Sequence, residues 1–148
     1  MNSVCRNTPP MNHVFTYGSL MFEPVWRRVV AGNYRQRPAQ IKGFERFAVR
    51  DQSYPGVVRS RLPLSTVNGI VYLEVGPADI ASLDRFEGAE YRRIDVPVHD
   101  IEELNDHQVI QASLYLYLPE NELLAQPWDA ANFERVTMAQ FLQRFCQP

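Results

Sequence analysis

The stretch HVFTYGSLMFEPVWRRVVAG, residues 13–32, contains a strand, a tight turn and a helix in direct succession. β-Branched and aromatic residues favour the strand, and the pair Gly18-Ser19 ends it. A helix is expected over 22–31, because Pro24 suits the first turn of a helix. Backbone N–H groups at such a turn lack partners and can bind an anionic group. The alternative is an ordinary strand-to-helix turn, since one Gly-Ser pair is a weak signal.

Short strands follow this opening unit. The alternation of faces is clearest over 67–75, where Val71, Leu73 and Val75 share one side of the strand. A charged segment over 100–107 is interpreted as a solvated turn. Further strands are expected at 39–41, 47–49, 56–59, 91–98 and 109–118.

Two more helices are expected. The first begins at Pro77, buries one side chain in each turn and ends at Gly88, which is placed to cap it. The second runs over 133–145, with apolar residues such as Val136 and Phe141 near helical spacing. The sequence therefore predicts an α+β fold, a small mixed β-barrel or curled sheet with two to three flanking helices.

A second candidate for chemistry is Glu87, at the end of the helix that begins at Pro77. It directly follows Phe86, which is expected to be buried, and precedes Gly88. Partial removal of this carboxylate from water would raise its pKa and make it a general base near neutral pH. The alternative is a solvated glutamate paired with Arg85 or Arg92, because most glutamates are exposed.

Length and composition set the broad class of protein. The chain has 148 residues, of which 45% are apolar and 22% charged, typical of one globular domain and unlike a disordered chain. A formal net charge of −2 gives no sign of a nucleic-acid partner, and no apolar run suits a membrane span. We expect a flexible tail over 1–11 and a single domain over 12–148, monomeric and cytoplasmic.

Cysteines and histidines give no metal-binding pattern. His13, His99 and His107 have no cysteine or carboxylate at the spacing of metal ligands, so no bound metal ion is expected. Cys5 and Cys146 stand near opposite ends of the chain and are interpreted as incidental thiols. A disulfide between them is the alternative, because the ends of a domain often lie close together.

Together these segments resemble the gamma-glutamyl cyclotransferase superfamily, most closely the branch named for plant avirulence-induced genes. The resemblance runs from Val14 to about Phe141 and implies a small mixed barrel with flanking helices. Its specific part is the combination of YGSL at 17–20 with LDRFEG at 83–88, since either motif alone is weak. Further similarity lies in the Tyr54-Pro55-Gly56 turn, in VNGIVY at 67–72, in Tyr91-Arg92, in the strand at 112–115 and in Trp128-Asp129.

The resemblance implies an enzyme without cofactor or metal that acts on a small γ-glutamyl compound. The α-amino nitrogen of the γ-glutamyl group attacks its own γ-carbonyl carbon, which closes 5-oxoproline and expels an amine or amino acid. Glu87 is implied as the group that takes a proton from the ammonium and returns it to the leaving amine. The resemblance also implies that backbone amides of the turn, at Gly18, Ser19 and Leu20, bind the substrate. Tyr17 and Tyr115 are implied as further binding residues, and the alternative is that both tyrosines belong to the core.

Other functions stay open from the residues alone. A binding module on the same fold would hold a small ligand without turnover, because a fold does not determine an activity. An interaction domain would use an exposed Trp128 and nearby aromatic side chains. No motif identifies the leaving group among a peptide, an amino acid, a polyamine and an isopeptide-linked lysine. Loops such as 51–54 and 105–108 are expected to select it.

Overall fold

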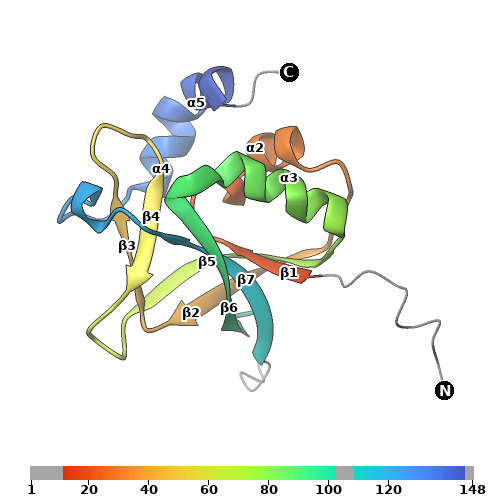
Figure 1. The fold of residues 1–148 in the computed structure, drawn as a ribbon, viewed down its shortest axis with the longest axis horizontal. Helices are drawn as coiled ribbons and strands as arrows, with labels where there is room; N and C mark the ends of the chain where they lie inside the picture. Colours follow the sequence, from red (N-terminus) through yellow and green to blue (C-terminus); the bar gives the residue numbers. More distant parts are fainter. Residues whose placement is uncertain (1–11, 103–108, 146–148) are drawn as a thin grey trace.

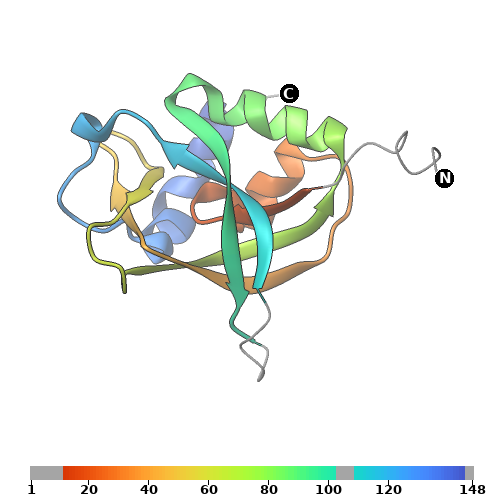
Figure 2. The ribbon, with the colours of Figure 1, turned by 60° about the horizontal axis from the view of Figure 1, so that its bottom comes forward.

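Five strands form a closed barrel in the computed structural model, which describes residues 12–102 and 109–145. Neighbouring strands run antiparallel, except where Val14 lies opposite Ser113 and the first strand pairs in parallel with the last. This parallel pairing closes the barrel (Figures 1 and 2). In order around it, the strands are β1 (Asn12–Thr16), β5 (Thr66–Val75), β2 (Gln36–Lys42), β6 (Tyr91–Asp100) and β7 (Val109–Tyr117).

A two-stranded sheet, β3 (Phe44–Ala48) and β4 (Pro55–Arg59), lies to one side of the barrel (Figure 1). The chain enters β3 through Gly43 at φ +83°, a conformation that glycine adopts without strain. β3 therefore begins at Phe44, earlier than the strand predicted over 47–49, and β2 extends beyond the predicted 39–41 at both ends. A Cβ on Gly56 would stand 2.6 Å from the Tyr117 ring, so β4 approaches β7 closely because position 56 is glycine.

Helices cover one end of the barrel. α2 (Glu23–Val29) and α3 (Pro77–Glu87) lie side by side, and α5 (Met138–Phe145) stands beside them (Figure 1). Asp79 joins α3 to the segment after α2, since its carboxylate accepts hydrogen bonds from the Tyr34 hydroxyl at 2.6 Å and from two backbone N–H groups, those of Ala31 and Gly32. Four further elements are short helical turns, η1 (Ser19–Met21), η2 (Gly88–Glu90), η3 (Glu120–Glu122) and α4 (Ala130–Asn132).

The helix predicted over 133–145 differs from a regular α-helix in its first part. Residues Phe133–Thr137 form a π-helical turn, η4, before α5 begins. The wider turn changes the phase of the side chains, so Val136 is 63% exposed while Phe133 and Phe141 are buried. Val136 and Phe141, which stand near helical spacing in the sequence, therefore differ in burial.

The core has three parts: the barrel interior, the space under the helices, and a smaller cluster where the small sheet meets β7. Trp128 belongs to the second part: it is buried and its indole N–H donates a 2.7 Å hydrogen bond to the Ser53 carbonyl oxygen. An interaction surface built on an exposed Trp128 is thus contradicted. Among the described helices, none has both the length and the apolar character that a membrane crossing demands.

The α+β fold class, a small mixed barrel with flanking helices, is confirmed. The expected tail over 1–11, Cys5, Cys146 and the loop 105–108 lie outside the described residues. Most of the charged segment 100–107 does so too.

Candidate functional site

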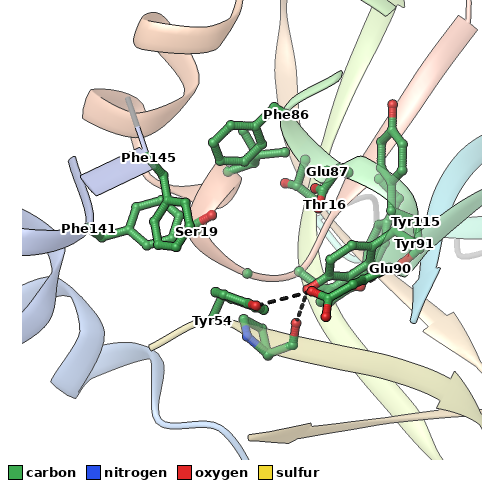
Figure 3. A pocket seen from close by; sticks show the side chains of 15 residues that line it. Thr16, Ser19, Tyr54, Phe86, Glu87, Glu90, Tyr91, Tyr115, Phe141 and Phe145 are labelled. Atoms are coloured by element: carbon green, nitrogen blue, oxygen red, sulfur yellow. Dashed lines mark hydrogen bonds between the residues drawn. The ribbon is translucent and has the colours of Figure 1, made fainter. Parts of the chain in front are cut away.

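A pocket opens where β1 ends, between the end of α3 and the face of α5 (Figure 3). Its volume is about 130 Å³, and it is open to solvent on one side. A volume of this size accommodates part of a small molecule. It is lined by Phe15, Thr16, Tyr17, Gly18, Ser19, Leu20, Tyr54, Pro55, Phe86, Glu87, Glu90, Tyr91, Tyr115, Phe141 and Phe145.

The floor of the pocket is the turn that follows β1. Two hydrogen bonds close this turn, from the Met21 N–H to the Gly18 carbonyl at 3.0 Å and from the Phe22 N–H to the Ser19 carbonyl at 3.1 Å. The N–H groups of Gly18, Ser19 and Leu20 therefore have no acceptor within the turn itself. A Cβ on Gly18 would stand 2.8 Å from the Pro55 ring, so the turn packs against β4 only with glycine there.

Two tyrosines tie this turn to the strand that closes the barrel. Tyr17 is buried, and its hydroxyl donates a 2.6 Å hydrogen bond to the backbone carbonyl of Tyr115. The Tyr115 hydroxyl in turn donates a 2.7 Å bond to the Asp84 carboxylate on α3. Burial raises the pKa of both tyrosines, so both hydroxyls keep their protons at neutral pH. Each tyrosine is thus a part of the core that also lines the pocket.

Glu87 is the last residue of α3, and its half-buried side chain faces the pocket (Figure 3). Gly88 follows at φ +76° and ends the helix, with its N–H bonded to the Asp84 carbonyl. Loss of hydration raises the pKa of the Glu87 carboxyl to about 8, and the nearby Asp84 charge adds to the effect. Within the described chain no ion pair joins Glu87 to Arg85 or Arg92, the arrangement that a solvated glutamate would favour.

Asp84 has the opposite environment. Burial opposes its ionisation, but hydrogen bonds from Arg93 and Tyr115 outweigh burial and lower its pKa. The Arg93 guanidinium contacts both carboxylate oxygens, at 3.0 and 3.3 Å. Asp84 is therefore a fixed negative charge beside Glu87.

The mouth of the pocket has an aromatic side and a polar side (Figure 3). On the polar side the Tyr54 hydroxyl donates a 3.3 Å hydrogen bond to the Glu90 carboxylate. Burial and the Glu90 charge raise the pKa of Tyr54 to about 12. The aromatic side is made of three rings in edge or tilted contact, Phe86, Phe141 and Phe145.

All six residues singled out from the sequence line this pocket: Tyr17, Gly18, Ser19, Leu20, Glu87 and Tyr115. Sequence reasoning did not predict that Tyr54, Glu90, Phe141 and Phe145 also line the pocket. Phe141 and Phe145 are spaced as one face of a helix, but that spacing does not say what the face meets. The sequence marks Tyr54 only as part of a turn, and no sequence pattern assigns a role to Glu90. No group of three or more metal-ligating side chains occurs in the part of the chain that the structure describes.

The chain is similar to several known proteins. A family model described as gamma-glutamyl cyclotransferase, AIG2-like, matches residues 14–133. AIG2-like protein D from Arabidopsis thaliana is 28% identical over 137 residues, which is 92% of this chain and 88% of that protein. The solution structure of an Arabidopsis thaliana protein matches with a TM-score of 0.69 and 25% identity, over 93% of this chain and 81% of the other. A structure named gamma-glutamyl cyclotransferase matches with a TM-score of 0.60 and 16% identity, over 93% and 88% of the two chains, a likeness of fold alone.

Proposed function

Since the chain belongs to the gamma-glutamyl cyclotransferase, AIG2-like family, we propose that it is a cyclotransferase acting on a small γ-glutamyl compound. In this reaction the α-amino nitrogen bonds to the γ-carbonyl carbon of the same glutamyl group. The bond from that carbon to the leaving nitrogen then breaks, and 5-oxoproline is released with a free amine or amino acid. The observation that carries the proposal is the position of Glu87, a carboxyl with raised pKa that lines the same pocket as the turn at 17–20.

Glu87 moves the proton in this proposal. The substrate amine is a nucleophile only after it has lost a proton, and the leaving nitrogen must gain one. A carboxyl with a pKa of about 8 lies much closer to the pKa of an amino group than an ordinary glutamate, at about 4.3, does. Glu87 can therefore take one proton from the ammonium and pass it to the leaving nitrogen. The attacking nitrogen gives up a second proton as the lactam forms, and the leaving amine takes up that proton and departs as an ammonium ion. No water or outside proton is consumed.

The turn after β1 holds the glutamyl end of the substrate. Its N–H groups at Gly18, Ser19 and Leu20 have no acceptor within the turn and stand at the pocket floor, where they can bind an anionic group. Ring closure needs the amine and the carbonyl carbon in one geometry, and this anchoring restricts the substrate to it. Tyr17 and Tyr115 line the pocket with protonated side chains, and their hydrogen bonds hold the turn against β7 and β7 against α3.

The test is release of 5-oxoproline from a pool of γ-glutamyl peptides, amino acids, alkylamines and isopeptides. We expect release by the native chain and a loss of at least about 100-fold in Glu87→Gln, which keeps the shape but cannot accept the proton. Glu102→Gln, two residues beyond the end of β6, is the control and should match the native chain. Equal release by Glu87→Gln would remove Glu87 from the mechanism.

The non-catalytic alternative has its own signature in the same experiment. A binding module on this fold would bind 5-oxoproline or a γ-glutamyl compound, as seen by calorimetry, and release nothing from any member of the pool. That outcome would leave the pocket as a ligand site and contradict the proposed reaction.

A further inference from the structure

Arg46 reaches the pocket floor from outside the barrel. It lies on β3, and its guanidinium donates a 2.7 Å hydrogen bond to the Tyr17 carbonyl oxygen and a 3.4 Å bond to that of Asn68. The same guanidinium lies over the Trp128 ring, 5.4 Å from its centroid. Arg46 is thus fixed from two sides while it holds the residue that precedes Gly18.

The carbonyl of Tyr17 and the N–H of Gly18 belong to one peptide unit. A peptide unit is planar and trans, so its C=O and N–H point in opposite directions. A guanidinium bound to the carbonyl therefore also fixes the direction of the N–H, which lies in the same plane on the opposite side of the C–N bond. The turn is held again at its other end, where the Tyr72 hydroxyl donates a 3.2 Å bond to the Leu20 carbonyl oxygen.

Stability alone does not account for a cation in this place. Burial lowers the pKa of Arg46, which means that the charged form is partly desolvated. Among the described residues, no carboxylate lies within ion-pair distance of Arg46 to offset this cost. Its partners are two carbonyl oxygens and a ring. A charge that binds a carbonyl also polarises the peptide and strengthens its N–H as a donor.

We infer that Arg46 is a positioning residue that fixes the Tyr17–Gly18 peptide plane and directs a polarised Gly18 N–H at the anionic end of the bound substrate. This inference rests on the proposed function, because it gives that N–H a substrate to bind. Arginine suits the position better than lysine, since its planar fork can engage the carbonyl and stack on Trp128 at once.

The test compares Arg46→Met with Arg59→Met. Arg59, on β4 of the same small sheet, also lies over a ring, that of Phe44, and donates no hydrogen bond to the turn at 17–20. We expect Arg46→Met to weaken 5-oxoproline binding roughly 10-fold to 100-fold, the effect of one charge-assisted hydrogen bond. The ¹H–¹⁵N resonance of Gly18 should move and KM should rise more than kcat falls. Arg59→Met should leave all three unchanged.

Arg46→Lys keeps a charge and a donor, and it serves where Arg46→Met does not fold. It should recover part of the 5-oxoproline affinity and move the Gly18 resonance back toward its native position. An active native chain whose Arg46 variants bind 5-oxoproline normally and keep the Gly18 resonance would overturn this inference alone. A native chain that neither releases nor binds 5-oxoproline would overturn the proposed function, and this inference with it.

Discussion

Asp84 and Glu87 lie one helical turn apart at the end of α3, and their surroundings move their pKa values in opposite directions. Hydrogen bonds from Arg93 and Tyr115 keep Asp84 ionised despite burial. Glu87 accepts no such hydrogen bond within the described chain. Burial and, to a smaller extent, the fixed charge of Asp84 raise the pKa of Glu87 and favour its protonated form. Asp84 is therefore suited to act as a fixed charge, and Glu87 is suited to carry a proton.

The first prediction concerns the pH dependence of activity. In the proposed reaction the free enzyme needs Glu87 ionised, so kcat/KM should rise with pH around a midpoint near 8. Asp84→Asn removes a negative charge that raises the pKa of Glu87, so the midpoint should move to lower pH. Initial rates of 5-oxoproline release across pH check this. Asp95→Asn on β6 is the control, and a midpoint that moves upward in Asp84→Asn would contradict the electrostatic account.

The second prediction concerns stability. A carboxyl whose pKa is raised by folding stabilises the native state fully below its unfolded pKa, and that contribution is lost as pH rises through about 8. Glu87→Gln has no charge to bury, so it should be more stable than the native chain at pH 8.5. The gain should be about 2 kcal/mol, reduced from the full pKa shift because the side chain is partly exposed. Urea unfolding at pH 5 and pH 8.5 measures it; an equal gain at both would show that ionisation is not the cause.

The third prediction tests the close packing of the turn on β4. Gly18→Ala would place a Cβ 2.8 Å from the Pro55 ring and push the turn out of place. We expect KM to rise about 10-fold, with a loss of stability of about 1–3 kcal/mol. Gly76→Ala is the matched control, because its Cβ would meet nothing nearer than 3.5 Å. Equal kinetic effects in the two variants would mean that the position of the turn does not control binding.

The fourth prediction concerns the leaving group. The lining of the pocket includes the carboxyls Glu87 and Glu90 and no lysine or arginine among the described residues, although Arg144 lies over the nearby Phe145 ring. A leaving group with a carboxylate should therefore react more slowly than its decarboxylated counterpart. The pair γ-glutamylalanine and γ-glutamylethylamine differs by that carboxylate alone. The ratio of their kcat/KM values should favour the amine and become smaller in Glu90→Gln; a preference for the amino acid would show that Arg144 dominates.

The fifth prediction separates the scaffold from the site. Asp79 accepts three hydrogen bonds from the Ala31, Gly32 and Tyr34 donors, and these bonds lower its pKa although burial acts against them. Asp79→Ala leaves the three donors unpaired and should cost about 2–4 kcal/mol of stability at neutral pH. Activity per folded molecule should be unchanged. In the native chain this stabilisation is present above the unfolded pKa and is lost as pH falls through the lower folded value. Ser82→Ala is the surface control.

Local patterns predicted much of this molecule. The strand, turn and helix of 13–32 and the helix that Gly88 ends lie within a few residues of their expected bounds, because each is specified by its own residues. Strand pairing was not predicted, since many partners satisfy one alternation pattern. The roles of Arg46 and of α5 at the pocket depend on segments far apart in the chain that meet only in the folded barrel.

The parallel pairing of Val14 with Ser113 also has a consequence for the order in which the barrel folds. During synthesis, β1 leaves the ribosome long before β7 exists, and the barrel stays open until β7 has followed. Val14 and Ser113 are 99 positions apart in the chain, and contacts between distant segments form slowly because the loop between them must close first. Because Tyr115 on β7 and two residues of α5, Phe141 and Phe145, all line the pocket, we expect binding capacity to arise only after the barrel has closed and α5 has packed. In a refolding experiment, binding of 5-oxoproline should therefore return with the slowest phase, after helical structure has recovered.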